Sequence, residues 1–313
     1  MTTWITRASA KLNLTLEVIG KRDDGFHDLA SIAISLDLAD EVRLTPSNSA
    51  RTISYRSEGG RRASIETDDD IVARAWDELD RHVGIPSGAS IEVVKRIPVT
   101  AGLGGGSTDA AAFLRLARTA WDLPLSDEAL CRIGAQVGSD VPACIVGGTV
   151  RMFGRGERVE PLSDPTNALE GCTVLLHRPE IPVPANKTAT MYRSLRSSDF
   201  RRGDATETLA ARIMNGSPPT QDDCVNSFDR PAREVMQGLA AAWRRMGAAL
   251  ARSTLELGDE PVMPLLAGAG PTIFALLSPQ VATHAARQLQ RSNGFTASAR
   301  PLSSSESTEF WTV

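Results

Sequence analysis

Hydrophobic and polar residues alternate along the first strand that the chain predicts. In residues 12–18, LNLTLEV, leucine or valine stands at every even position and a polar residue at every odd one. This period of two predicts a half-buried β-strand. A turn or short loop is expected at 20–25, and the weaker alternation over 30–44 predicts further strand. Residues 90–97, rich in β-branched side chains, predict another strand.

Helical spacing appears where this alternation stops. Residues 70–82 have apolar side chains about one turn apart and acidic residues at their start, which predicts a helix. A run of small helix formers predicts a second helix that ends at about Thr119. A third begins with Ser126 as N-cap and ends near Gly138. Residues 138–157 predict a turn followed by a glycine-punctuated pair of strands.

The texture of the sequence changes at residues 160–170, where prolines and polar residues predict a linker. A strand over 173–177, a proline-rich loop and several amphipathic helices are expected beyond it. A second glycine turn at 267–271 precedes a strand-like segment over 272–277. The fold class is therefore α+β, with two halves, 1–160 and 161–313.

Composition limits the function classes. The chain of 313 residues is long enough for two domains, and its 42% hydrophobic and 23% charged residues are those of an ordinary globular protein. A net charge of −4 gives no reason to expect nucleic acid or an anionic membrane as a partner. The start of the chain lacks a signal-peptide core, and no apolar run is long enough to span a bilayer, so the cytoplasm is expected. The dispersed cysteines and histidines suggest reduced thiols and no zinc site. We expect a monomer or a weak homodimer.

Lysine is scarce, with four lysines against thirty arginines. Genomic base composition accounts for most of this bias. Each lysine nevertheless stands where arginine was the usual choice, and the two are not interchangeable where a compact charge is needed. The four are Lys11, Lys21, Lys95 and Lys187.

A glycine-rich segment between the predicted strand at 90–97 and the next helix carries the most specific signal. Glycine lets a backbone approach a polyphosphate closely, and a helix start offers free N–H groups and positive potential. The segment is neither a Walker A loop nor a dinucleotide fingerprint. A tight turn packed against a helix is the alternative to a phosphate cradle. The candidate ATP-binding residues are Pro98, Val99, Thr100, Ala101, Gly102, Leu103, Gly104, Gly105, Gly106, Ser107 and Thr108.

Taken together, five segments resemble one family. They are AKLNL at 10–14, GKRDDGFH at 20–27, GLGGGSTDAAA at 102–112, GSDVP at 138–142 and AGAGPT from 267. The set resembles the GHMP kinases, named for galactokinase, homoserine kinase, mevalonate kinase and phosphomevalonate kinase. The resemblance implies an N-terminal ribosomal-protein-S5-like α/β domain, a C-terminal ferredoxin-like α+β domain and an active site in the cleft between them. The GKRDDGFH segment resembles the corresponding segment in the branch of this family that phosphorylates 4-diphosphocytidyl-2-C-methyl-D-erythritol.

The resemblance also implies roles for individual residues. Asp140 would accept the proton of the acceptor hydroxyl, and Lys11 would keep Asp140 ionised and offset charge on the transferring phosphoryl group. Taken singly, Lys11 could be a solvated strand-end lysine and Asp140 a turn residue. ATP and Mg²⁺ are the implied cofactors. Ser107 and Thr108 would bind phosphate or help to place Mg²⁺, or would cap the helix.

Further residues are implied on the acceptor and adenine sides. Phe26 would stack on the cytosine and His27 would hydrogen-bond to it, with a packed phenylalanine and a surface histidine as the alternatives. Asn13 and Tyr192 are candidate substrate contacts, and Gly268 and Gly270 would approach phosphate. Asp70 stands where the family usually has asparagine, which affects the expected adenine contact. Alanines replace serine or threonine at 267 and 269, and the second side of the cytidine pocket does not match the family pattern at 183–185.

Two other functions fit part of the pattern. A relative acting on another small alcohol, such as homoserine or mevalonate, would keep the glycine loop, but GKRDDGFH argues against it. A nucleotide-binding sensor without catalysis would fit the altered second glycine turn, but the retained Lys11 and Asp140 argue against it.

Overall fold

The computed structural model describes residues 2–58, 70–85, 88–162, 166–290 and 292–313. Within these residues, nine strands form a first sheet whose main path is β13-β1-β2-β4-β3. β5 extends from β2 and carries β6, β12 also pairs with β2, and β8 pairs with β1. The strands are β1 (Trp4–Lys21), β2 (His27–Pro46), β3 (Thr52–Ser57), β4 (Ala89–Lys95), β5 (Thr149–Gly154), β6 (Arg158–Pro161), β8 (Val225–Asn226), β12 (Pro301–Leu302) and β13 (Phe310–Thr312).

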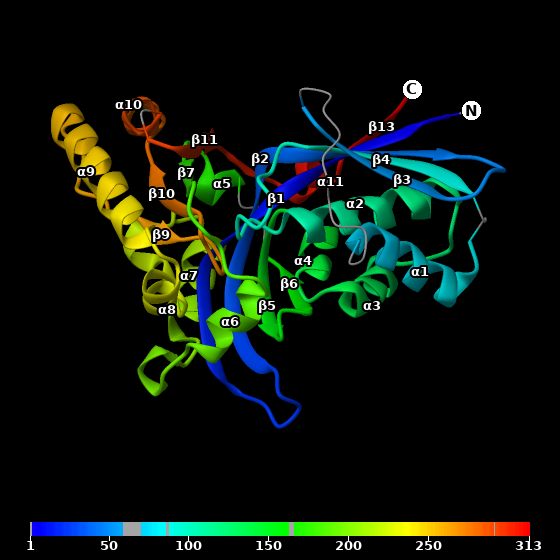
Figure 1. The fold of residues 1–313 in the computed structure, drawn as a ribbon, viewed down its shortest axis with the longest axis horizontal. Helices are drawn as coiled ribbons and strands as arrows, with labels where there is room; N and C mark the ends of the chain where they lie inside the picture. Colours follow the sequence, from blue (N-terminus) through cyan, green and yellow to red (C-terminus); the bar gives the residue numbers. More distant parts are fainter. Residues whose placement is uncertain (1, 59–69, 86–87, 163–165, 291) are drawn as a thin grey trace.

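Four helices lie together on one face of this sheet (Figure 1). They are α1 (Ile71–Val83), α2 (Gly105–Ala120), α3 (Asp127–Val137) and α4 (Val141–Val146). Apolar residues of α1 and α2 pack against β2 and β4 in one buried cluster that contains Trp76 and Phe113. Ser126 caps α3 by accepting a hydrogen bond from the Ala129 N–H, as the sequence predicts.

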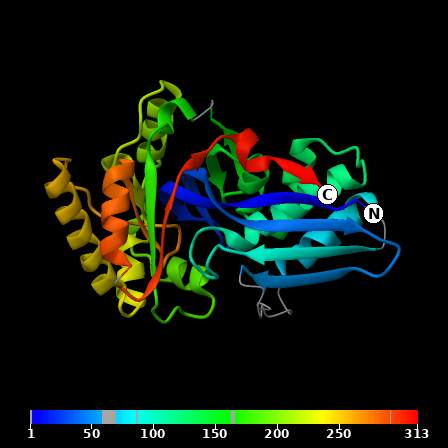
Figure 2. The same cartoon turned by 90° about the horizontal axis from the view of Figure 1, so that it is seen from above.

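A second, antiparallel sheet has the order β11-β7-β10-β9. Figure 2 shows α9 and α10 on the side of this sheet that faces away from the first one. Its strands are β7 (Thr173–Pro179), β9 (Leu265–Leu266), β10 (Ile273–Leu277) and β11 (Gly294–Ala299). The remaining elements are α5 (Thr166–Leu169), α6 (Lys187–Arg193), α7 (Asp204–Met214), α8 (Asp229–Val235), α9 (Leu239–Leu257), α10 (Pro279–Leu289), α11 (Ser304–Thr308) and the short 3₁₀ turns η2 (Ser197–Asp199) and η3 (Gln221–Asp223).

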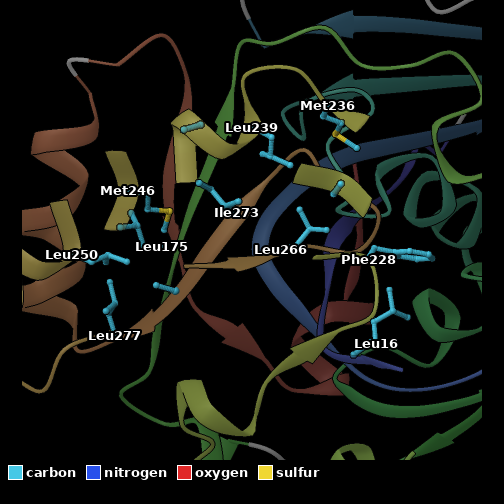
Figure 3. Packing of buried hydrophobic residues seen from close by; sticks show 14 of the residues in the cluster. Leu16, Leu175, Phe228, Met236, Leu239, Met246, Leu250, Leu266, Ile273 and Leu277 are labelled. Atoms are coloured by element: carbon cyan, nitrogen blue, oxygen red, sulfur yellow. The ribbon is translucent and has the colours of Figure 1, made fainter. Parts of the chain in front are cut away.

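The two sheets share buried contacts. Leu16 of β1 belongs to the same cluster as Phe228, Leu266 and Ile273 from the second part of the chain (Figure 3). The chain then returns, because β12 and β13 pair with β2 and β1, and the backbones of Thr3 and Val313 exchange two hydrogen bonds of 3.0 Å. The division into 1–160 and 161–313 stays a prediction; sheet membership alone would place the last strands with the first sheet.

β1 is buried on both sides, so the expectation of a half-buried strand is wrong. Register shifts against β2 fall between Ser9 and Lys11 and between Asn13 and Thr15. Such bulges change which way successive side chains point. α7 covers the polar side: the Thr206 N–H donates to Glu17 Oε2 at 2.8 Å. The long strand therefore brings polar side chains into the centre of the molecule.

The secondary structure confirms most of the predicted elements. The strands around 12–18, 30–44, 90–97, 173–177 and 272–277 are present, as are the helices expected over 70–82, up to about Thr119, and from Ser126 to near Gly138. One element differs: residues 141–146, expected as part of a turn and a pair of strands, form α4 before β5 and β6. Pro142 in its first turn favours this helix start. Part of the expected linker, 163–165, lies outside the described residues.

The described residues were compared with the expectations for membrane spans, metal sites and cysteines. None of their helices is both long and apolar enough to cross a membrane. No group of three or more His, Cys, Asp or Glu side chains among them could hold a metal ion. The four cysteines are free, as expected from their scattered positions.

Candidate active site

Motifs that are far apart in the sequence line one cavity of about 1390 Å³. The β1–β2 hairpin, the glycine loop (residues 102–106), the start of α4, the start of α6 and the second glycine turn (residues 267–271) all contribute to its lining. All four lysines of the chain line it as well. Cationic side chains are therefore concentrated around one space large enough for two small ligands.

Lys11 and Asp140 meet in this cavity. Lys11 Nζ lies 3.0 Å from Asp140 Oδ2, and the side chains are 8% and 41% exposed. Asp140 is the N-cap of α4 but makes no side-chain bond to the helix amides. The carboxylate is thus open to solvent and has a buried ammonium beside it. Such a carboxylate can accept a proton from a hydroxyl that binds next to it.

A chain of hydrogen bonds fixes the orientation of Lys11. Its Nζ donates to Asn13 Oδ1 at 3.1 Å, and Asn13 Nδ2 donates to Ser31 Oγ at 2.7 Å. Ser31 in turn donates to the carbonyl of Thr15. Because the amide of Asn13 has a donor on one side and an acceptor on the other, its two ends are distinguished and its oxygen is held toward Lys11.

The glycine loop approaches other segments more closely than side chains would permit. A Cβ at Gly102 would lie 2.4 Å from the carbonyl oxygen of Ala267, and one at Gly268 would lie 2.7 Å from the carbonyl oxygen of Gly102. Both residues also have positive φ. Asn226 holds the second turn by donating to the carbonyls of Leu266 and Gly268 at 2.9 and 2.8 Å. The two glycine turns are thus packed directly on one another.

The start of α2 points into the cavity. Gly104, in the left-handed conformation, is the N-cap and supplies no side-chain bond, and the first intrahelical acceptor is its own carbonyl, which receives the Thr108 N–H. The N–H groups of Gly105, Gly106 and Ser107 precede that bond, and all three residues line the cavity. A helix start of this kind is suited to an anion.

Beneath the loop, Lys95 forms a buried triad with two aspartates. Its Nζ donates to Asp109 Oδ2 at 2.6 Å and to Asp40 Oδ2. Asp40 Oδ1 also accepts the N–H groups of Arg96 and Ile97, where the chain leaves β4 for the loop. Burial disfavours the charge of Lys95, but the two carboxylates outweigh this effect and raise its pKa.

An aromatic cluster (His27, Tyr192, Phe200 and Phe228) lines another part of the cavity. The His27 ring stacks on Tyr192 with centroids 4.6 Å apart and on Phe200 at 6.3 Å, and Tyr192 meets Phe228 edge-on at 5.0 Å. Burial, and then the positive charge of Lys21, lower the pKa of His27. Its imidazole is therefore neutral at pH 7, with one ring nitrogen a donor and the other an acceptor.

The neighbouring Phe26 also lines the cavity. It is half exposed, and the guanidinium of Arg155 lies 4.6 Å from its ring centre. The guanidinium of Arg155 therefore covers one face of the Phe26 ring. Burial, and then the charge of Asp140, raise the pKa of Tyr192 to about 12, and Tyr192 lines the same cavity as the Lys11–Asp140 pair.

Known proteins that resemble this chain along most of its length are kinases of the family that the sequence motifs indicate. Residues 70–148 match the family model for the GHMP kinases N terminal domain. A 4-diphosphocytidyl-2-C-methyl-D-erythritol kinase from Dehalococcoides mccartyi is 37% identical over 86% of this chain and 88% of its own length. One from Enterococcus faecalis is 37% identical over 87% of this chain and 89% of its own length. The chain belongs to the 4-diphosphocytidyl-2-C-methyl-D-erythritol kinase family.

Solved structures confirm the GHMP kinase fold that the sequence motifs imply. A crystal structure of 4-(cytidine 5'-diphospho)-2C-methyl-D-erythritol kinase superimposes with a TM-score of 0.72, at 28% identity, covering 95% of this chain and 99% of that one. A homoserine kinase from Cytophaga hutchinsonii reaches a TM-score of 0.71 at 16% identity, over 100% of this chain and 97% of that one. The second likeness concerns the fold alone.

Within this kinase family fold, most of the expected site residues line the cavity, and four do not. Asp70 caps α1 by accepting from the Val72 and Ala73 N–H groups and also accepts the Tyr55 hydroxyl. Thr108 donates its hydroxyl to the Gly105 carbonyl, as a residue of the first helical turn does. Leu103 is buried in the core. The fourth is Gly270. Binding roles for these four stay predictions.

Several cavity residues escaped prediction from the motifs. Tyr55, Arg155, Phe200 and Phe228 lie outside the five segments that resemble the family, and they reach the site only through the fold. Lys187 and Lys95 carry a signal that was available in the sequence, because lysine is so scarce in this chain. Because all four lysines line one cavity, the scarce lysines of the sequence mark the position of the site.

Proposed function

We propose that this chain transfers the γ-phosphoryl group of ATP to the 2-hydroxyl of 4-diphosphocytidyl-2-C-methyl-D-erythritol, a step of non-mevalonate isoprenoid synthesis. The observation that carries the proposal is the place of the Lys11–Asp140 pair. A Cβ at Gly104, the N-cap of α2, would lie 3.3 Å from Lys11 Cβ, and the aromatic cluster lines the same cavity as the pair. The pair thus shares one cavity with the glycine loop and the aromatic cluster, where donor and acceptor would meet.

Asp140 would act as the base. The acceptor oxygen forms a bond to the γ-phosphorus, the bond from that phosphorus to the bridging oxygen of ADP breaks, and the hydroxyl proton passes to Asp140 Oδ1 or Oδ2. Phosphoryl transfer needs little covalent work from the protein, so a positioned carboxylate with a neighbouring ammonium suffices. Lys11, held by Asn13 at 3.1 Å, offsets negative charge at the transferring group.

The nucleotide would occupy the side of the cavity formed by the glycine loop. The amides at the start of α2 would receive its phosphates. Ser107 lines the cavity there, and its hydroxyl is a hard oxygen ligand of the type that Mg²⁺ prefers, so Ser107 would help to hold the ion, which would neutralise part of the phosphate charge.

The acceptor would occupy the side formed by the aromatic cluster. Phe26 offers an aromatic face for a cytosine, and the neutral His27 offers a donor and an acceptor for its edge. Because Arg155 covers one face of Phe26, a stacking base would either take the other face or displace the guanidinium. Tyr192 belongs to this cluster, and Asn13 lines the same cavity and contacts Lys11 of the catalytic pair.

The test is release of ADP from Mg-ATP with and without 4-diphosphocytidyl-2-C-methyl-D-erythritol, beside a panel containing homoserine and mevalonate. We expect release that depends on the cytidine-linked alcohol. A faster reaction with another alcohol would transfer the function to that substrate. Nucleotide binding without ADP release from any alcohol would favour a sensor.

A further inference from the structure

Lys187 joins the two glycine turns although it belongs to neither. It is the first residue of α6, and its Nζ donates to the Thr100 carbonyl at 2.9 Å and to the Gly270 carbonyl. Thr100 leads into the glycine loop, and Gly270 lies in the second glycine turn. One ammonium group therefore bridges two segments that are about 170 residues apart in sequence and lie at the same cavity.

The electrostatic surroundings of Lys187 call for an anion. Lys11 and Lys95 each contact a carboxylate, whereas the recorded contacts of Lys187 among the described residues are carbonyl oxygens. Carbonyls carry only partial negative charge, so they accept hydrogen bonds from the ammonium but do not neutralise it.

The geometry leaves Lys187 able to bind a further group. An ammonium has three N–H donors, and two of them are used by carbonyls. Thr100 has φ of 56°, a strained backbone conformation for a β-branched residue, and Lys187 holds its carbonyl. One donor remains, and Lys187 lines the same cavity as the glycine loop.

We propose that Lys187 is a phosphate-binding residue that donates its third N–H to the β- or γ-phosphate of the nucleoside triphosphate held by the glycine loop. The inference rests on the proposed function for the identity of the nucleotide as phosphoryl donor. The bond to Thr100 favours this polyphosphate over the diphosphate of the acceptor. Lys187 thereby gives the second part of the chain a direct contact with a ligand bound by the first.

The acid–base properties of Lys187 make the proposal testable by pH. Burial lowers its pKa to about 8, Arg178 of β7 and Lys11 of β1 act in the same direction, and Asp140 at the start of α4 opposes them. A bound polyphosphate would raise this pKa again, because it favours the charged form. Binding then takes up a proton above pH 8, so ATP affinity falls as pH rises past that value. The last ionisation of phosphate, near pH 6, is complete in this range.

The experiment compares ATP and AMP binding by calorimetry in the full chain. The proteins are wild type, Lys187→Met, Lys187→Arg, and Arg287→Met, whose exposed arginine on α10 lies outside the cavity and controls for net charge. We expect Lys187→Met to raise the Kd for ATP by about 10-fold or more and the Kd for AMP by less than about 2-fold. Lys187→Arg should recover part of the loss. Between pH 7.5 and 9.5 the Kd for ATP should rise in wild type and stay flat in Lys187→Arg.

Other outcomes overturn the proposal. Equal losses for ATP and AMP would make Lys187 a structural bridge only. An unchanged Kd for ATP with a raised KM for the alcohol would assign Lys187 to the acceptor. If Lys187→Met does not fold, Lys187→Gln decides, because an unchanged Kd for ATP in that variant contradicts the proposal. Binding needs no turnover, so failure of ADP release in wild type would refute the proposed function separately.

Discussion

Two lysines at the same cavity contact aspartates, and the aspartates differ in exposure. Asp140, paired with Lys11, is 41% exposed, whereas Asp40 and Asp109, paired with Lys95, are 0% and 2% exposed. Asp140 makes no bond to nearby amides, whereas Asp40 accepts two backbone N–H groups. Lysine and aspartate are therefore paired in two ways here. The carboxylate of Asp140 is open to a ligand, whereas that of Asp40 is bound by the backbone.

This difference teaches how to separate reacting groups from supporting ones. An exposed carboxylate beside a buried ammonium can exchange protons with a ligand, and it contributes little to stability because solvent screens it. A carboxylate buried among N–H donors, as Asp40 is, has both oxygens occupied, and its loss leaves partners unsatisfied. The comparison predicts that substitutions in the first pair act on turnover and those in the second act on folding.

The largest effect should follow from Asp140→Asn. Asparagine keeps the shape but cannot take the proton, so kcat should fall by about 10²-fold or more. The Kd for ATP should change by less than about 2-fold, and the free energy of unfolding by less than about 1 kcal/mol. Steady-state ADP release, calorimetry and urea denaturation measure the three quantities.

The matched control for that variant is Asp77→Asn on α1, where an exposed aspartate pairs with Arg51 outside the cavity. It removes the same charge and should leave kcat unchanged. Turnover by Asp140→Asn at the level of this control would remove Asp140 from the mechanism.

Lys95→Met should have the opposite signature. It leaves two buried carboxylates without their cation, and breaking a buried pair in this way costs about 3–5 kcal/mol of folding free energy. Urea denaturation should show the loss, with Arg43→Met as the control for a partly exposed arginine that pairs with Glu41. A fully stable Lys95→Met with impaired ATP binding would place Lys95 among the ligand contacts and abolish the distinction.

The sequence was most informative where one local pattern decides the structure. Alternation predicted β1, and the glycine run predicted the start of α2, because strand period and backbone freedom depend on neighbours in the chain. The same local view failed for α4, whose residues 141–146 favour strand by composition but form a helix that packs under the site. A Cβ at Gly134 would lie 2.9 Å from Val141, so the close approach of α3 and α4 requires that glycine.

The candidate site was predictable in part for the same reason. Lys11, Asp140 and the glycine loop belong to motifs, and the structure brings them into one cavity. Arg155 and Phe200 belong to none, since only tertiary packing places them there. The burial of β1 on its polar side also could not be inferred from alternation, because it depends on α7, which is contributed by residues almost 200 positions away.

The smallest effect should come from Asp109→Asn, and pH reveals it. Burial raises the pKa of Asp109 well above its usual range, and the charge of Asp40 adds to this despite the opposing Lys95. A carboxyl with a raised native pKa holds its proton in the folded state after the unfolded chain has lost it. Its contribution to stability is therefore present below pH 4 and declines as pH rises from there through the native pKa.

Asp109→Asn should remove that decline. Because the amide stays neutral, stability at pH 7 should change by about 1 kcal/mol or less, far from the loss expected for Lys95→Met. The slope of unfolding free energy against pH above 4 should become more positive in the variant than in wild type. An unchanged slope would mean that Asp109 is fully ionised in the folded protein, and the triad would then carry its buried negative charge at neutral pH.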